Sequence, residues 1–179
     1  MKWLRNPRPA GAQRTGTRAL RSTTACPGLR PDPGSLILLA EDSRVTRIMV
    51  RTWLERSGQT VVEAEDGQEA WERFSQGPDR GRIGLVLTDV MMPRMDGLEL
   101  ARRVRELDPD MPIGVLTSNS DQETADTAFN LGVDVFLNKP FEVQELAHCL
   151  ERLLAAREQR QRARRTRESA AGQRPEPGF

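Results

Sequence analysis

Two rhythms of apolar and polar residues alternate along the middle of the chain, between about residues 35 and 156. Short apolar runs bounded by turn-forming residues are typical of buried strands, whereas apolar residues three and four positions apart are typical of one helix face. The runs with strand character are 36–40, 60–64, 84–90, 111–118 and 133–138. A segment with helical spacing follows each run, so the pattern predicts five strands and five helices in alternation.

The helical segments are defined by their apolar faces and by the residues that stop them. RSG at 56–58 ends the first segment, Pro109 stops the third, the fourth spans about 121–131, and the last begins near Glu142. The apolar positions that define these faces are Val45, Ile48, Met49, Thr52 and Trp53 in the first helix, Ala70, Trp71 and Phe74 in the second, Leu98, Ala101, Val104 and Leu107 in the third, and Val143, Leu146, Leu150, Leu153 and Leu154 in the last.

Strands that alternate with helices form βαβ units, whose parallel sheet is covered by helices on both faces. Because the crossovers are right-handed, few topologies remain. The sequence therefore predicts an α/β fold with a doubly wound, five-stranded parallel sheet. In the flavodoxin-like order 2-1-3-4-5, the carboxyl ends of strands one, three, four and five border one crevice.

The two ends of the chain differ from this middle part in composition. Residues 1–34 hold seven basic residues and one acid, Asp32, which resembles an organellar transit peptide. We favour a disordered basic arm, or upstream sequence that is not translated. Residues 157–179 are rich in arginine and mix in acids, so we expect a short extension of the last helix, solvated and then disordered. The predicted domain spans 35–156.

Composition excludes several classes of protein. The net charge is +1, so whole-molecule charge gives no argument for nucleic acid binding, and nothing after residue 156 has the periodicity of a DNA-binding domain. The two cysteines, Cys26 and Cys149, indicate neither a disulfide framework nor a thiolate metal site. No run of about 18 apolar residues predicts a membrane span. We expect a cytoplasmic protein.

Charged and polar residues mark the carboxyl ends of the predicted strands. Glu41 and Asp42 end the first strand, Asp89 the third and Thr117 the fourth, and Lys139 follows the fifth. Two like charges about 4 Å apart cost on the order of 4 kcal/mol at an effective dielectric near 20, and Lys139 returns only one positive charge. Hard oxygen ligands in a polar crevice favour Mg²⁺, or Mn²⁺ in its place. Each residue alone is explained by a cap or a turn, but five together predict a metal site.

On the basis of these residues, the segment from about residue 35 to residue 156 resembles the receiver domain of bacterial response regulators. The matching motifs are AED at 40–42, EAEDGQEA at 63–70, LTDVMMPRMDG at 87–97, VLTS at 115–118 and NKPF at 138–141. The pattern D-x-x-M-P-x-M-D-G is the most specific of them. Glu41 departs from the family, since Asp is commoner there, but its longer side chain should still reach a metal.

The resemblance implies phosphoryl transfer from a phosphohistidine, on a sensor histidine kinase or a phosphotransfer protein, to Asp89. Asp89 would be the nucleophile, while the acid pair, the metal and Lys139 neutralise charge on the phosphoryl group. The main-chain carbonyl of Met91 would complete the metal ligands, and the Thr117 hydroxyl would hydrogen-bond a phosphoryl oxygen.

The resemblance also implies a switching residue and bears on the lifetime of the phosphorylated protein. Phe136 occupies the position of the family's switching aromatic residue, which would rotate inward as Thr117 moves. The alternative is that Phe136 is a permanent core residue. Met91 and Asn119 flank the path of the attacking water, and neither is charged, so we expect a comparatively long-lived phosphoprotein. The Lys139–Pro140 peptide is predicted to be cis.

We interpret the chain as a stand-alone, chemotaxis-regulator-like response regulator, a signalling switch that catalyses its own phosphorylation and dephosphorylation. Its output is a surface that binds an unknown downstream protein, and the face formed by the fourth helix, fifth strand and fifth helix is a candidate for dimerisation. Two alternatives stay open: a non-phosphorylated receiver scaffold, and an aspartate-nucleophile phosphohydrolase. The latter resembles D-x-D after the first strand, whereas here Met91 follows Asp89 by two positions.

Overall fold

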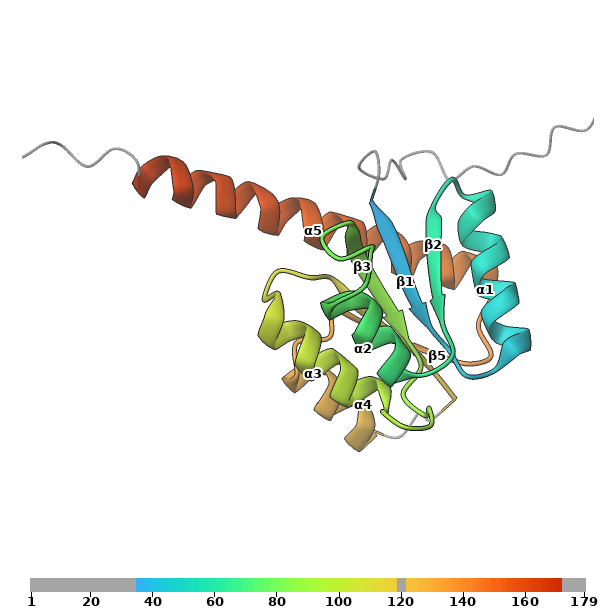
Figure 1. Cartoon of the computed structure of the whole chain (residues 1–179). Helices are drawn as coiled ribbons and strands as arrows, with labels where there is room; N and C mark the ends of the chain where they lie inside the picture. The colour runs from blue at the N-terminus through green and yellow to red at the C-terminus, as the bar shows by residue number, and fades with distance from the viewer. Residues whose placement is uncertain (1–34, 119–121, 172–179) are drawn as a thin grey trace, which may run out of the picture.

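The computed structural model describes residues 35–118 and 122–171, in which five strands alternate with five helices (Figure 1). The strands are β1 (Leu36–Ala40), β2 (Thr60–Ala64), β3 (Ile83–Thr88), β4 (Ile113–Thr117) and β5 (Val135–Asn138). The helices are α1 (Arg44–Arg56), α2 (Gly67–Ser75), α3 (Gly97–Leu107), α4 (Gln122–Asn130) and α5 (Val143–Ala171). The predicted alternation is confirmed; β1 and β2 match their apolar runs, while β3, β4 and β5 are one to three residues shorter than theirs.

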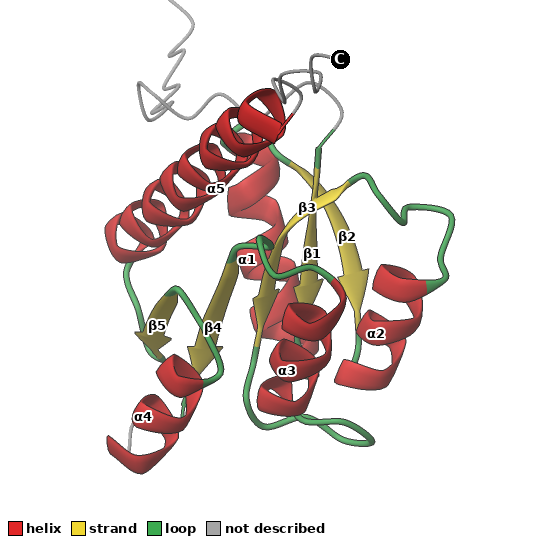
Figure 2. Cartoon of the chain, turned by 90° about the vertical axis from the view of Figure 1, so that its left-hand side faces the viewer, coloured by secondary structure: helices red, strands yellow, loops and turns green. Residues whose placement is uncertain are grey.

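The strands form one parallel sheet in the order β2-β1-β3-β4-β5, which confirms the predicted doubly wound fold. Helices α2, α3 and α4 cover one face of the sheet, and α1 and α5 cover the other (Figures 1 and 2). Since β1 pairs with β2 on one side and β3 on the other, the chain leaves the carboxyl ends of β1 and β3 at neighbouring points.

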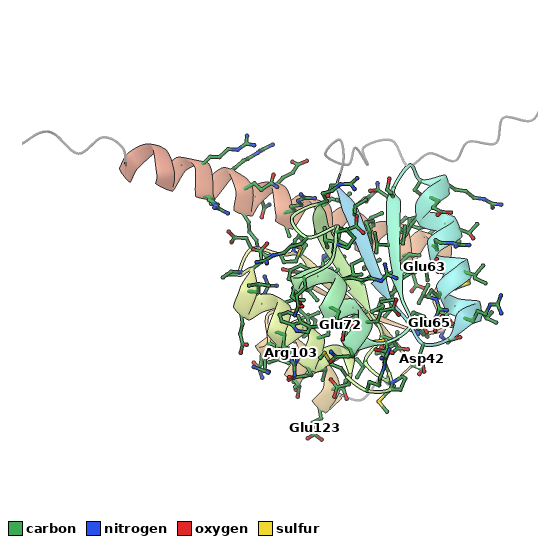
Figure 3. The ribbon with its side chains drawn as sticks, in the orientation of Figure 1. Asp42, Glu63, Glu65, Glu72, Arg103 and Glu123 are labelled. Atoms are coloured by element: carbon green, nitrogen blue, oxygen red, sulfur yellow. The ribbon has the colours of Figure 1, made fainter. Side chains whose placement is uncertain are left out.

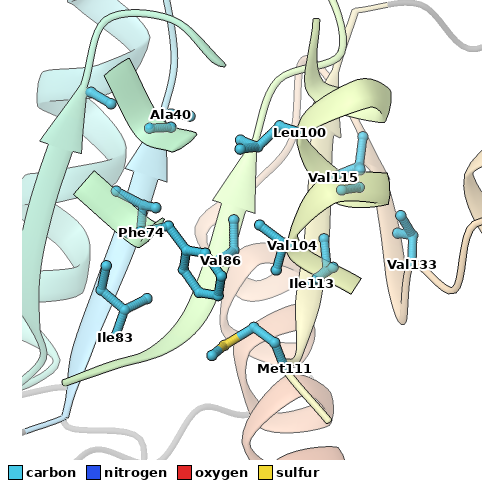
Figure 4. Close-up of a cluster of buried hydrophobic side chains, with 14 of the residues drawn as sticks. Ala40, Phe74, Ile83, Val86, Leu100, Val104, Met111, Ile113, Val115 and Val133 are labelled. Atoms are coloured by element: carbon cyan, nitrogen blue, oxygen red, sulfur yellow. The ribbon is translucent and has the colours of Figure 1, made fainter. Parts of the chain in front are cut away.

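Side chains of the central strands alternate between two buried clusters, because successive residues of a strand point to opposite faces. In β1, Leu36, Leu38 and Ala40 pack with α2 and α3 residues in one cluster (Figure 4). Ile37 and Leu39 enter the other cluster, which α1 and α5 close. The two clusters sandwich the sheet and hold its carboxyl edge rigidly.

Three side chains cap the helices that follow the carboxyl ends of β1, β2 and β3. Ser43 Oγ accepts from the Thr46 amide at the start of α1. Asp66 caps α2 through the Glu69 amide, and Asp96 caps α3 through the Glu99 amide. Such caps satisfy amides that have no partner in the first turn of a helix. Each of the three loops at this edge therefore ends at a defined residue.

Three of the five residues predicted for the inner face of α1 are wrong, while Thr52 and Trp53 are half-buried. The residues that α1 buries are Arg47, Val50 and Leu54, with Trp53 half-buried beside them. Val45 is 80 % exposed, and Ile48 and Met49 also lie in solvent. The sequence has two apolar stripes along this helix. The inner stripe includes an arginine, so a count of apolar residues favours the outer stripe.

Two further predicted core positions are also wrong, and both lie at helix ends. Leu107 ends α3 and is 46 % exposed, while Val143 begins α5 and is 56 % exposed. Elsewhere α5 buries Leu146, Leu150 and Leu153, as its spacing predicts.

Helix α5 continues without a break through residue 156 to Ala171 and projects past the sheet (Figure 1). Arg157 donates to Ser35 Oγ, and its guanidinium lies where a side chain at position 84 would be, so a larger residue at position 84 would displace the Arg157 side chain. Arg160 pairs with Asp134, in the turn before β5. The division at residue 156 stays a prediction, and residues 1–34 and 172–179 lie outside the described residues.

No helix in the described ranges combines the length and the apolar character that crossing a membrane requires. The cytoplasmic location stays a prediction.

Burial of Cys149 between α5 and the sheet should protect its thiol. Burial raises the pKa of this thiol to about 12, from 9.0, so at pH 8 its thiolate is about 1000-fold scarcer than that of an exposed cysteine. In a Cys26→Ser chain, we expect Cys149 to react with a disulfide reagent at least about 1000-fold slower in native buffer than in urea. Absorbance of the released thiolate gives both rates. Native labelling within tenfold of the unfolded rate would show that α5 detaches readily.

Candidate functional site

Three carboxylates converge at the carboxyl edge of the sheet. Glu41 and Asp42 directly follow β1, and Asp89 directly follows β3. Because Ala40 and Thr88 are aligned in the β1–β3 register, these acids start from the same level of the sheet. One ligand oxygen from each lies within 4.8 Å of the others. Glu41 and Asp89 are buried, whereas Asp42 faces solvent, so the site is open on one side.

Lys139 links two of these acids across the site. Its Nζ donates to Glu41 Oε2 at 2.5 Å and to Asp89 Oδ2 at 2.6 Å. The Lys139 amide donates to the Thr117 carbonyl at 2.7 Å, which holds the end of β5 beside the end of β4. The Lys139–Pro140 peptide is cis, as predicted. The structure thus brings together four of the predicted site residues: Glu41, Asp42, Asp89 and Lys139.

The burial of Glu41 makes its charge costly. Desolvation raises the pKa of the Glu41 carboxyl, and the negative charge of Asp89 adds to the rise. The hydrogen bond and positive charge of Lys139 oppose this rise, and the Ser43 amide, which donates to Glu41 Oε1 at 3.3 Å, opposes it weakly. A second cation beside Glu41 would favour the ionised carboxylate further.

The donor set fits a divalent cation with oxygen ligands. Mg²⁺ binds oxygens at about 2.1 Å, so two of its ligands are at most about 4.2 Å apart. The three carboxylates are already near that separation. Fully ionised, they carry two charges more than Lys139 balances. Thus Glu41, Asp42 and Asp89 could hold Mg²⁺ with little rearrangement, while solvent reaches the site past Asp42.

The backbone of Asp89 is held from both sides. Its amide donates to the Ala40 carbonyl at 2.9 Å, and its carbonyl accepts from Thr88 Oγ1 at 2.9 Å. A Cβ at Gly97 would lie 1.8 Å from the Asp89 carbonyl oxygen, so only glycine allows α3 to start this close. Asp89 Oδ1 accepts from the Met91 amide at 3.2 Å. These contacts aim the Asp89 carboxylate into the site.

The remaining predicted residues lie around this cluster or outside the described range. Thr117 is fully buried at the end of β4. The Met91 side chain is 61 % exposed. Phe136, in β5, is half-buried and its ring centroid lies 6.4 Å from that of Phe129 in α4. Asn119 lies outside the described residues. The roles assigned to these residues stay predictions.

Two arginines near the site were missed by the sequence analysis. Arg47 is buried behind the acid pair and donates to its main-chain carbonyls. Arg94, with a φ of 63°, pairs with Asp66 and ties the loop after β3 to the start of α2. The signal for Arg47 was its spacing, since it shares a helix face with Val50 and Leu54. Nothing in the sequence pattern indicated Arg94.

Comparisons with known proteins agree on one family. The sequence profile of the response regulator receiver domain matches residues 37–151. Over 125 residues the chain is 38 % identical to the response regulator receiver protein CpdR of Brucella abortus, covering 67 % of this chain and 97 % of CpdR. Over 119 residues it is 42 % identical to the response regulator MprA of Mycobacterium ulcerans, covering 66 % of this chain and 49 % of MprA. The chain therefore spans about half the length of MprA.

Solved structures show the same likeness. The chemotaxis protein CheY4 of Vibrio cholerae matches with a TM-score of 0.60 and 30 % identity, over 66 % of this chain and 98 % of CheY4. A response regulator receiver protein from Pseudomonas putida also matches with a TM-score of 0.60 and 30 % identity, over 65 % of this chain and 95 % of that protein.

Removing one carboxylate should separate metal binding from stability. In Asp42→Ala we expect Mg²⁺ affinity to fall at least about tenfold, because a ligand is lost. The metal-free variant should be as stable as the wild type or more stable, because repulsion is relieved. Titration followed by Trp53 and Trp71 fluorescence, with thermal unfolding, measures both. Glu72→Gln, which removes a distant surface acid, is the control. An unchanged affinity in Asp42→Ala would contradict the metal site.

Proposed function

The chain belongs to the response regulator receiver family, and on that basis we propose that it is a phosphorylation-dependent switch with Asp89 as its phosphoacceptor. Receiver domains of two-component systems interact with histidine kinases or phosphotransfer proteins and generally bind Mg²⁺. The observation that carries the proposal is the Lys139 ammonium, which bridges Asp89 and Glu41 inside a cluster of three carboxylates. A structural salt bridge would need neither the third acid nor the opening at Asp42.

The proposed reaction uses the Asp89 carboxylate as the nucleophile. An Asp89 oxygen attacks the phosphorus of a phosphohistidine; the new O–P bond forms as the N–P bond breaks, and the electron pair stays on the imidazole nitrogen. A carboxylate is already deprotonated, so the step needs no general base. Lys139, within hydrogen-bonding distance of Asp89, would bind an oxygen of the transferred group and offset its charge.

Glu41, Asp42 and Asp89, with the Met91 carbonyl, would hold Mg²⁺, which supplies charge neutralisation for the phosphoryl oxygens. Thr117 would hydrogen-bond the phosphoryl group, and the change would reach Phe136 through the end of β4 and β5, which pair from Gly114 to Thr117. Phe136 contacts Phe129 on α4, so α4 and β5 would form the responsive part of the surface. Dimerisation through α4, β5 and α5 stays a prediction.

We propose that the phosphodonor protein approaches over α1. Val45, Ile48 and Met49 form an exposed apolar patch on this helix, directly after the acid pair. Thr46 and Met49 also line a 390 Å³ hollow with Lys139 and Phe141. Apolar side chains next to the site suit the helical surface of a histidine kinase or phosphotransfer protein, which must bring its phosphohistidine to Asp89. We name this set Val45, Ile48 and Met49 the α1 patch.

Asp89→Asn should retain the fold yet take up no phosphoryl group. Wild-type protein incubated with acetyl phosphate and Mg²⁺ should form an adduct that hydroxylamine releases, as an acyl phosphate does, and mass spectrometry should place it on Asp89. Asp79→Asn, outside the site, is the matched control and should be labelled normally. Labelling of Asp89→Asn at the wild-type rate would overturn the assignment. A wild-type protein that takes up no phosphoryl group would favour the scaffold alternative.

A charge in the α1 patch should block the protein donor and spare the small one. For Ile48→Asp we expect phosphotransfer from a cognate kinase, found by phosphotransfer profiling, to fall at least about tenfold. Uptake from acetyl phosphate should stay within about twofold, because α1 exposes this side chain away from the core. Leu107→Asp, at an exposed apolar position on α3, is the control. Equal loss with both donors would place the defect in the site and contradict the docking proposal.

A further inference from the structure

Arg47 is a buried cation directly behind the acid pair. Arg47 lies in the first half of α1, and its side chain is 9 % exposed. Its Nη1 donates to the Glu41 carbonyl at 2.6 Å and more weakly to the Asp42 carbonyl at 3.5 Å. The guanidinium thus holds the main chain of both acids without touching their carboxylates.

Two acids, Glu63 in β2 and Glu65 just after its end, contact the other side of the guanidinium. Arg47 Nη2 donates to Glu65 Oε1 at 2.8 Å, and Nε lies 3.5 Å from Glu63 Oε1. Figure 3 shows Glu63 on β2 and Glu65 beyond its carboxyl end, near Asp42 in this view. A planar guanidinium with donors on several edges can make all these contacts at once, whereas an ammonium cannot reproduce their geometry. Arg47 therefore ties the turn between β1 and α1 to the end of β2.

We propose that Arg47 is a positioning residue that presents Glu41 and Asp42 to the Mg²⁺ ion. This inference rests on the proposed function. Peptide units are planar, so fixing the carbonyls of residues 41 and 42 fixes the two peptide planes that flank Asp42 and the direction of its Cα–Cβ bond. Among the described residues, no hydrogen bond to the Asp42 carboxylate holds it in place. Its orientation therefore depends on the backbone that Arg47 restrains.

The direction in which Mg²⁺ affinity changes on removal of Arg47 distinguishes a positioning role from a purely electrostatic one. A cation near the site repels Mg²⁺, so if Arg47 acted by charge alone, its removal would tighten metal binding. If Arg47 orients the acids, its removal must weaken metal binding, because the ligands are no longer preorganised. Groups that orient metal ligands typically contribute about 10–100-fold in metal affinity.

Arg51 provides a matched control one turn further along α1. It pairs with Glu63 at 2.9 Å, an acid that it shares with Arg47, but it donates to neither the Glu41 carbonyl nor the Asp42 carbonyl. In the full chain, Arg47→Met should weaken Mg²⁺ binding at least about tenfold, Arg47→Lys should lose less, and Arg51→Met should stay within about twofold. Tryptophan fluorescence titration gives the affinities, and circular dichroism confirms the fold of each variant.

A second readout needs no metal. In the metal-free protein, amide hydrogen exchange of Ser43 should be at least about tenfold faster in Arg47→Met than in the wild type, and unchanged in Arg51→Met. Equal or tighter Mg²⁺ binding in folded Arg47→Met or Arg47→Lys overturns the inference. If Arg47→Met does not fold, Arg47→Lys alone decides between weaker and tighter binding. Absence of Mg²⁺ binding in the wild type would instead overturn the proposed function.

Discussion

Repulsion among three acids at one edge of the sheet is the constraint around which the rest of the molecule is organised. Glu41 and Asp89 are withdrawn from water, and their oxygens lie near those of Asp42. The only ammonium that the described residues place between them is that of Lys139, which reaches both buried acids. A site with an excess of negative charge has a high affinity for further positive charge, and it costs folding free energy until that charge arrives. The fold must therefore be stable enough elsewhere to tolerate this cost.

That stability comes from the two apolar clusters on either side of the sheet and from polar contacts that restrain the loops. Arg94 ties the loop after β3 to the cap of α2, and Gly97 lets α3 begin against the Asp89 carbonyl. Arg47 restrains the acid pair from behind. Gly97 and Arg47 act on the main chain of the acids in the site, and Arg94 pairs with Asp66, so none of the three contacts a carboxylate of the site.

Sequence reasoning predicted the parallel sheet from the alternation of strands and helices, took its order from the flavodoxin-like fold, and predicted the acid cluster from the residues that end each strand. It failed on α1, because an inward-facing arginine, held by carbonyls of another segment, resembles a surface residue in any pattern of hydrophobicity. It also failed at Leu107 and Val143, since helical periodicity does not reveal where the sheet beneath a helix stops. Arg94 was missed for a related reason: its partner, Asp66, is 28 positions away, and only the fold brings them together. Interactions that depend on two loops meeting cannot be read from either loop.

Because α5 is long, a small tilt of this helix would displace its outer end. Its 29 residues extend about 43 Å, while Leu153 is the last fully buried residue among those of α5 whose burial is described, up to residue 166. Arg160 joins the projecting part to Asp134, in the turn that leads into β5. The 18 residues after Leu153 extend about 27 Å, so a tilt of about 5° about the last buried turn would displace the end of the helix by about 2 Å. Small rearrangements of β5 would therefore produce their largest displacement far from the acids, at the outer end of α5.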